Sequence, residues 1–128
     1  MWRINFKLGN PEPISSLKKY QETIAILNRT IEREPSLAIA YYSRGNYKAK
    51  NMRRQEAELD LTKAILLDKD FKEAYYERGI CRLESENFEG AISDFSEAIK
   101  FNYNRVDAYY FRGMSNVLIG QYKKGILD

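Results

Sequence analysis

The side chains of this chain that could do chemistry are carboxylates, tyrosines, basic groups and one thiol. Its 128 residues include 18 Asp or Glu, ten Tyr and a single Cys, and there is no His. Catalysis by Ser-His-Asp or Cys-His groups is therefore excluded, as are the usual zinc sites that need His. The seven glycines form no G-x-x-x-x-G-K phosphate loop. The composition predicts no enzyme, no cofactor and no metal, and it favours recognition by contact.

Tyrosine, arginine and glycine recur together at a constant spacing. The segments 40–45, 74–79 and 108–113 read AYYSRG, AYYERG and AYYFRG, so the period is 34 residues. A second series has the same period and consists of Arg44, Asp60, Arg78, Asp94, Arg112 and Asp128. An arginine at a helix interface needs a polar partner there. The aspartate of the same or an adjacent repeat is the expected partner.

Each period predicts two helices joined by a short turn. The first helices are expected at 38–51, 72–85 and 106–119, and the second at 54–68, 88–102 and from 122 onward. In the second helix of the middle repeat, apolar residues recur at steps of three and one, which is the helical stripe. The joins at 51–53, 85–87 and 119–121 are too short for anything but antiparallel helices. The predicted fold class is therefore all-α.

Small residues mark where the two helices of a pair approach each other. The repeated glycines fall in mid-helix, where Gly costs about 1 kcal/mol relative to Ala. A cost that recurs in every period indicates close packing, with small Ala residues opposite and an aromatic ring beside the contact. This structural signature consists of Tyr41, Gly45, Ala57, Ala64, Tyr75, Gly79, Ala91, Phe95, Ala98, Tyr109 and Gly113. The lone thiol, Cys81, is expected to be a buried apolar residue.

This 34-residue unit, with an aromatic residue, then Gly, then Ala twice, resembles the tetratricopeptide repeat (TPR) over roughly residues 15–128. Arginine replaces the usual Leu before each Gly, and Lys69 and Tyr103 stand where a Pro commonly closes the repeat. The resemblance implies a right-handed superhelix of antiparallel helix pairs, a TPR-like α-solenoid. It also implies that the first helices line a concave face that binds a partner.

The chain divides into an N-terminal arm at 1–14 and a TPR-like domain at 15–128. The domain comprises a leading half repeat at 15–37, repeats at 38–71 and 72–105, and an incomplete repeat at 106–128. In the arm Trp2, Ile4, Phe6 and Leu8 alternate with polar residues, which predicts either a lid over the first helix or a mobile tail.

The C-terminal end lacks the polar cap that repeat proteins normally carry. Its apolar residues are expected to be uncovered, and they are Val117, Leu118, Ile119, Ile126 and Leu127. An uncovered apolar patch usually marks an interaction surface. The chain is therefore interpreted either as a fragment of a longer protein or as one that self-associates through this end.

The resemblance places a partner-binding groove on the first helices. Its expected residues are Tyr42, Asn46, Lys50, Glu73, Tyr76, Glu77, Ile80, Glu84, Asp107, Tyr110, Phe111 and Met114. Four of these are acidic and one is basic. Some co-chaperone TPR domains hold acidic chaperone tails with a clamp of Lys, Asn and Arg. This sequence has Tyr rather than Lys at the key groove positions, and of the Asn residues only Asn46 is present. We expect a partner with basic and apolar side chains, although the tyrosines could instead pack between repeats.

A protein-interaction scaffold is thus the leading function. One alternative is a helical-repeat nucleic-acid-binding protein, and another is a purely structural or self-associating module of a larger protein. The basic cluster of Arg44, Lys48, Lys50, Arg53 and Arg54 could meet phosphate or form a solvated helix face. No apolar run approaches the roughly 18 residues of a membrane span, and no signal peptide is visible, so a cytoplasmic location without membrane contact is expected.

Overall fold

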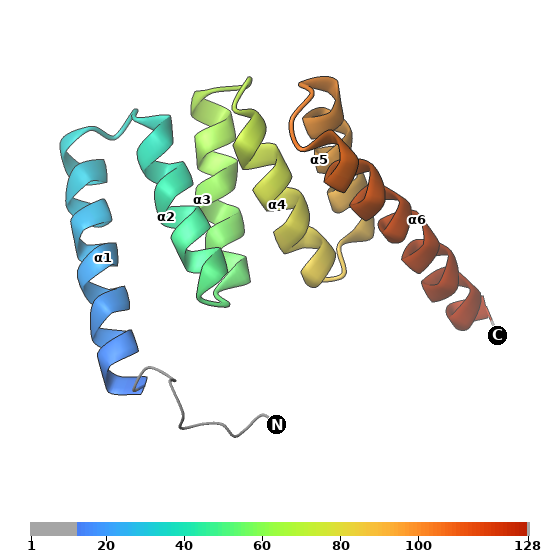
Figure 1. Cartoon of the computed structure of the whole chain (residues 1–128), viewed down its shortest axis with the longest axis horizontal. Helices are drawn as coiled ribbons and strands as arrows, with labels where there is room; N and C mark the ends of the chain where they lie inside the picture. The colour runs from blue at the N-terminus through green and yellow to red at the C-terminus, as the bar shows by residue number, and fades with distance from the viewer. Residues whose placement is uncertain (1–12, 128) are drawn as a thin grey trace.

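The computed structural model describes residues 13–127, and every regular element in that range is an α-helix (Figure 1). The helices are α1 (Pro13–Arg33), α2 (Ala38–Lys50), α3 (Arg54–Leu67), α4 (Lys72–Glu84), α5 (Phe88–Lys100) and α6 (Arg105–Leu127). Neighbours in sequence lie side by side in one row and alternate in direction. The predicted all-α class of antiparallel helix pairs is confirmed. The arm residues Trp2, Ile4, Phe6 and Leu8 lie outside the described range.

The leading helix α1 takes the place of a second helix before α2. It begins at Pro13, two residues before the predicted start, and a proline is well tolerated in a first helical turn. Tyr20 is its buried side chain, and the Tyr20 ring stacks on Tyr47 of α2 with 5.5 Å between ring centroids. The guanidinium of Arg53 lies 4.6 Å from the centre of the Tyr20 ring. An aromatic contact therefore joins α1 to the first complete repeat.

The first two repeats turn in the same way. The chain reverses at Met52 and Glu86, whose φ angles are 66° and 65°. These residues lie one period apart, and the left-handed conformation costs a residue other than Gly about 1–2 kcal/mol. The amide of Arg53 donates to the Lys48 carbonyl after α2, which satisfies a carbonyl left free at the helix end. Packing of each second helix on its first helix offsets the cost of the turn.

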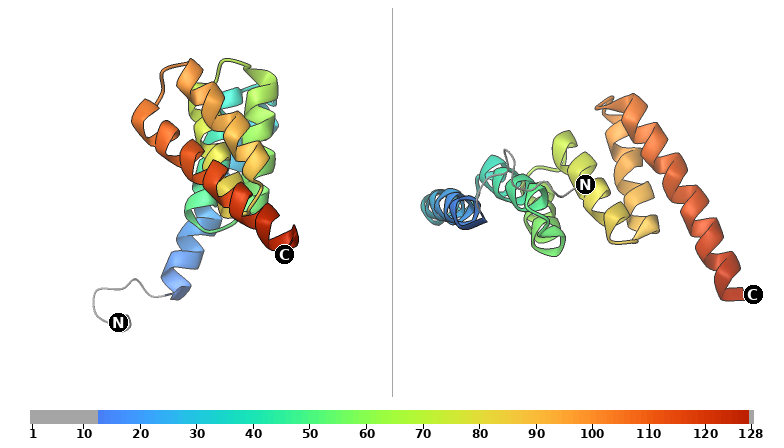
Figure 2. Two further views of the ribbon diagram at one scale, coloured as in Figure 1. Left: turned by 90° about the vertical axis from the view of Figure 1, so that its right-hand side faces the viewer. Right: turned by 60° about the horizontal axis from the view of Figure 1, so that its bottom comes forward.

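The predicted turn at 119–121 is wrong, because α6 continues as one helix to Leu127. Gly120 stands one period after Glu86, at a residue type that suits a left-handed turn. In the described range, however, no helix lies against α6 as α3 lies against α2. Without that packing, each further residue gains an i→i−4 hydrogen bond by continuing the helix. Figure 2 shows the last part of α6 projecting away from the row.

The core forms where second helices press on glycines of first helices. A Cβ atom on Gly45 would lie 3.0 Å from Cγ of Leu61 and 3.1 Å from the carbonyl oxygen of Ala57. A Cβ on Gly79 would lie 2.9 Å from Cε1 of Phe95. Leu61 and Phe95 are fully buried, as are the signature alanines Ala57, Ala64, Ala91 and Ala98. Gly is thus required in these pairs for close helix approach.

Gly113 does not play the packing role that its place in the repeat predicts. No atom lies within 4 Å of the position that its Cβ would occupy, and the residue is exposed. The reason is the missing partner helix, since the glycine of a first helix is covered by the second helix of the same repeat. The signature therefore marks a contact in two repeats and an open helix face in the third.

The two kinds of glycine give a matched pair of substitutions. We expect Gly79→Leu to lower the free energy of unfolding by about 3 kcal/mol, because overpacking a filled core costs about 1–3 kcal/mol even for small additions. Gly113→Leu gains the same helix propensity, about 1 kcal/mol, without a clash and should leave stability unchanged or higher. Urea unfolding followed by circular dichroism measures both. Equal losses in the two variants would contradict the packing described here.

Candidate partner-binding face

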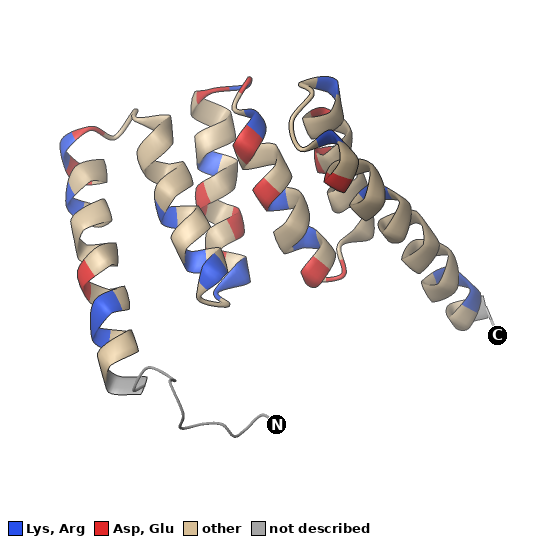
Figure 3. Cartoon of the chain, in the orientation of Figure 1, with Lys and Arg blue, Asp and Glu red and all other residues tan. Residues whose placement is uncertain are grey.

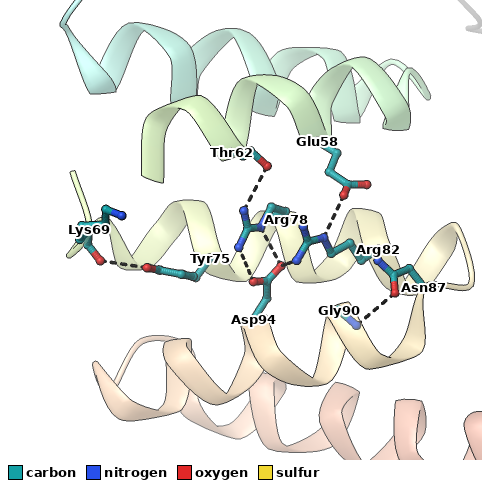
Figure 4. Close-up of polar contacts among 9 residues, drawn as sticks. All are labelled: Glu58, Thr62, Lys69, Tyr75, Arg78, Arg82, Asn87, Gly90 and Asp94. Carbon is teal, nitrogen blue, oxygen red and sulfur yellow. Dashed lines mark hydrogen bonds and ion pairs between the residues drawn. The ribbon is translucent and has the colours of Figure 1, made fainter. Parts of the chain in front are cut away.

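The first helices are tied to their neighbours by arginines that replace an apolar residue of the repeat. Arg78 of α4 donates from Nε and Nη2 to the two carboxylate oxygens of Asp94 on α5, at 2.9 and 2.8 Å (Figure 4). Its Nη1 donates to Oγ1 of Thr62 on α3, at 3.1 Å. One side chain therefore connects three consecutive helices and fixes α4 between them.

The preceding repeat has the same arrangement one period earlier. Arg44 of α2 donates to both oxygens of Asp60 on α3, at 2.8 and 2.7 Å, and to Oδ1 of Asn28 on α1, at 2.9 Å. The hydrogen bond to Asp60 raises the pKa of Arg44, although burial opposes this effect. The structure thus joins Arg44 to Asp60 and Arg78 to Asp94, within a repeat, with a further bond to the helix before.

A second basic residue bonds to each of these two aspartates. Arg82 lies one turn after Arg78 and donates to Asp94 at 3.2 Å and to Glu58 of α3 at 2.9 Å (Figure 4). Lys48 makes the corresponding ion pair with Asp60, at 3.2 Å. Asp94 is only 1% exposed, and this burial raises its pKa against the opposing effect of the two arginines.

The third arginine bonds to a single described partner. Nη1 of Arg112 donates to Oγ of Ser96 on α5, at 3.0 Å, while Asp128 lies outside the described residues. Asn28, Thr62 and Ser96 occupy one position of the 34-residue period, and sequence reasoning missed all three. Their shared signal was a short polar side chain at every period, which becomes meaningful only once each is seen to accept from the arginine.

The signature tyrosines lie beside these arginines. The guanidinium carbons of Arg44, Arg78 and Arg112 lie 5.6, 5.8 and 5.1 Å from the centres of the Tyr41, Tyr75 and Tyr109 rings. Such cation–π contacts add roughly 0.5–1 kcal/mol each at exposed sites. Tyr75 also donates its hydroxyl to the Lys69 carbonyl, at 3.1 Å. In each repeat the arginine therefore contacts both a polar partner and a tyrosine ring.

The groove tyrosines Tyr42, Tyr76 and Tyr110 differ from one another in exposure. Tyr76 is only 8% exposed, and its ring makes edge-on contacts with Phe95 at 5.9 Å and Tyr103 at 5.7 Å. Tyr42 is half-buried, with its ring 4.9 Å from that of Phe71. Tyr110 is 62% exposed. Tyr42 and Tyr76 thus pack between repeats, whereas the Tyr110 ring contacts Phe111 at 5.3 Å and is otherwise largely exposed.

The groove carboxylates also differ in what they contact. Glu84 pairs with Arg54 at 2.8 Å, and Glu73 approaches the neighbouring Lys72 at 3.9 Å. Glu77 is half-buried, and burial raises its pKa, while the charge of Lys50 acts in the opposite direction. Asp107 is exposed in the first turn of α6. Figure 3 shows acidic residues at the beginnings of α4 and α6, next to each other in the row.

The remaining groove residues have mixed surroundings. Ile80 and Phe111 pack against the core around Phe95, while Met114 is half-buried and Lys50 is exposed. Nδ2 of Asn46 donates to the Tyr42 hydroxyl at 3.5 Å, and Oδ1 of Asn46 is buried without a hydrogen-bond partner in the described part of the chain. Ile80 and Phe111 thus belong to the packing between helices, and Lys50 to the surface.

Most of the basic cluster is already neutralised by carboxylates. Figure 3 shows basic residues gathered at the turn between α2 and α3. Besides the bonds of Arg44 and Lys48 to Asp60, Lys48 and Arg53 lie 3.6 and 3.9 Å from Glu56. The bridge from Arg54 to Glu84 spans the two repeats. Groups held in ion pairs have little charge left for phosphate, so this cluster does not favour nucleic acid.

Cys81 is a structural residue of the core. It is 1% exposed, and burial, followed by the charges of Glu84 and Glu77, raises the pKa of its thiol to about 12. A thiol with such a pKa holds almost no reactive thiolate near neutral pH. The residues described also include no group of His, Cys, Asp and Glu that could hold a metal ion.

The helix arrangement is shared with solved TPR domains. The first TPR of Spaghetti (RPAP3), bound to the HSP90 peptide SRMEEVD, is 20% identical, with a TM-score of 0.75 over 82% of this chain and 83% of that chain. The TPR2B domain of yeast Sti1, in a complex with pHsp70, is 19% identical, with a TM-score of 0.72 over 80% and 87%. No protein-family model and no curated protein matches the sequence.

A third solved structure adds similarity in sequence. The second TPR of Spaghetti (RPAP3), bound to the same HSP90 peptide, is 30% identical, with a TM-score of 0.63 over 65% of this chain and 77% of that chain. Together with the 34-residue period and the paired helices, these matches show that the chain belongs to the TPR family. Over the described residues, no helix is both long and apolar enough to cross a membrane.

The hydrogen bonds of Arg78 to Asp94 and Thr62, here called the Arg78 clamp, lead to a prediction about stability and its pH dependence. We expect Arg78→Ala to lower the free energy of unfolding at neutral pH by about 3–5 kcal/mol, because the Asp94 carboxylate stays buried and loses two hydrogen bonds. The folded-state pKa of Asp94 is raised. The stability that its protonated form contributes is therefore present at low pH and lost as the pH rises through that pKa. The loss of stability caused by Arg78→Ala should therefore be smaller near pH 4 than at neutral pH.

Arg112→Ala is the matched control. Its one described side-chain hydrogen bond is with Ser96, and removing a single such bond costs about 1 kcal/mol. Chemical unfolding of both variants at two pH values checks the prediction. A loss for Arg78→Ala no greater than that for Arg112→Ala would contradict the clamp.

Proposed function

We propose that this chain is a non-catalytic protein-interaction scaffold that binds a partner segment along the face formed by α2, α4 and the first part of α6. The observation that carries the proposal is an excess of carboxylate on this face. Glu77 and Asp107 form no ion pair with any described residue, and the contact of Glu73 is a marginal one with its neighbour Lys72. Charges left unpaired beside aromatic rings favour a partner that brings the opposite charge.

Apolar groups beside these carboxylates add contact area. Tyr110 is 62% exposed and Val106 is 82% exposed, both on the first turns of α6. A tyrosine ring offers a large contact at a low entropic cost and keeps a hydroxyl for hydrogen bonding. A segment with alternating basic and apolar side chains therefore suits the face better than a purely basic one.

The charge of this face does not suit the acidic peptide that is bound by similar domains. The Spaghetti domains are described as bound to SRMEEVD, a peptide with two glutamates and a terminal aspartate. Glu73, Glu77 and Asp107 would repel such a tail, and Lys50 is the single basic residue among the expected groove positions. We therefore propose a partner of the opposite charge, with the fold conserved and the ligand chemistry reversed.

A peptide library should test this directly. We expect selection on the chain to enrich peptides with Arg or Lys next to apolar residues, and we expect no calorimetric binding of MEEVD, the acidic end of SRMEEVD without its arginine. Glu77→Lys should weaken a selected peptide about tenfold or more by reversing a charge on the face. Glu89→Lys on α5 is the control, since Glu89 is an exposed residue outside the expected groove. Tight binding of MEEVD would refute the proposed specificity.

The uncovered side of α6 supports self-association as a second candidate function. Val117 and Ile126 are 59% and 70% exposed, and Gly113 is open. In the first repeat Gly45 meets Ala57, and the same separation counted from Gly113 leads to Gly125. Two antiparallel copies of α6 crossing near Gly120 would bring Gly113 of one copy close to Gly125 of the other. This arrangement needs no break in α6.

Light scattering tests the second candidate. We expect the weight-average mass to rise toward that of a dimer with concentration, and Val117→Asp to abolish the rise, because a buried unpaired charge costs several kcal/mol. Leu59→Asp is a suitable control, since Leu59 is 73% exposed on α3 within a complete repeat. A chain that remains monomeric at millimolar concentration would exclude this function.

A further inference from the structure

Six side chains from three neighbouring repeats converge on one part of the face, here called the tyrosine–carboxylate site. They are Tyr42 of α2, Glu73, Tyr76 and Glu77 of α4, Tyr103 of the following turn, and Asp107 of α6. The Tyr76 and Tyr103 rings meet edge to face at 5.7 Å. Tyr103 stands where the TPR pattern commonly has Pro, so this departure adds a phenol to the site.

The groups of the site are close enough for their charges to shift one another's pKa values. Burial, then the charges of Glu77, Tyr103 and Glu73, raise the pKa of Tyr42 to about 12. Burial, then Glu73 and Glu77, also raise the pKa of Tyr103. The pKa of Tyr76 is raised by burial and next by Asp107. The phenols therefore stay protonated, and each keeps an oxygen that can accept a hydrogen bond beside the carboxyl groups.

No basic side chain of the described residues fills the middle of this site. Lys50 is close enough to oppose the rise in the pKa of Glu77, yet it forms no ion pair with that carboxylate. Lys72 approaches Glu73 only at 3.9 Å and is nearly half exposed. Beside the site, Oδ1 of Asn46 is a further acceptor without a partner. The site thus combines a surplus of acceptors with a surplus of negative charge.

We infer that the tyrosine–carboxylate site binds the guanidinium group of an arginine side chain supplied by the partner segment. The inference rests on the proposed function and names the side chain that anchors the partner. A guanidinium is planar and carries five N–H donors, which match several carboxylate and phenol oxygens at once, and it packs well on aromatic rings. A lysine ammonium offers a single, strongly hydrated point charge and matches fewer of these acceptors.

The closing experiment uses small probes and the full chain, so it does not depend on any selected peptide. Acetyl-arginine amide is titrated into the chain labelled for nuclear magnetic resonance, next to acetyl-citrulline amide, which has the same shape without the charge. We expect saturable shifts at Tyr42, Tyr103 and Glu77, with the citrulline probe binding at least tenfold more weakly. The corresponding lysine compound serves as a third probe, and its affinity should lie between those of the arginine and citrulline probes.

Matched variants locate the binding. Glu77→Gln should weaken the arginine probe about tenfold, while Glu89→Gln should not, because Glu89 is an exposed residue of α5 outside the expected groove. Lys50→Met should strengthen binding several-fold, since it removes the cation whose charge acts on Glu77. Equal binding of the arginine and citrulline probes, or shifts confined to other parts of the chain, would overturn the inference. Peptide selection that succeeds while the arginine probe fails would refute this site alone and leave the scaffold function standing.

Discussion

The buried pairing of an arginine with an aspartate is the interaction on which the rest of this structure depends. Arg78 joins α4 to α5 through Asp94 and to α3 through Thr62, and Arg44 repeats the pattern one period earlier. Burying two charges is costly, so such a pair adds little net stability compared with apolar residues. Its value lies in geometry, because a bidentate pair is satisfied in only one register of the helices.

That register determines what the face can bind. These arginines fix α2 between α1 and α3, and α4 between α3 and α5. Tyr42 and Tyr76 use most of their surface to pack between repeats, so the charges beside them gain influence. The arginines inside therefore hold the helices together, while the proposed recognition falls to the carboxylates outside.

The contrast between repeats shows how much each helix relies on the one that covers it. Gly79 packs against Phe95, whereas a Cβ atom on Gly113, at the same position of the next repeat, would meet no neighbouring helix among the described residues. The helix α6 also continues through Gly120, where a turn was predicted. A turn in the left-handed conformation forms at Met52 and Glu86 because packing offsets its cost. Local sequence favours the turn equally well in the third repeat, but the packing that would hold it is absent from the described residues.

The sequence by itself determined the period, the helix pairs, the positions of close packing and the arginine–aspartate series, because all of these follow from residue types that recur every 34 residues. It did not determine that α6 is unbroken or that Tyr76 is buried while Tyr110 is exposed. The roles of Asn28, Thr62 and Ser96 were equally hidden. The physical reason is that a period assigns equal environments to equivalent residues, whereas burial, hydrogen-bond partners and turns depend on which neighbouring helix is actually present.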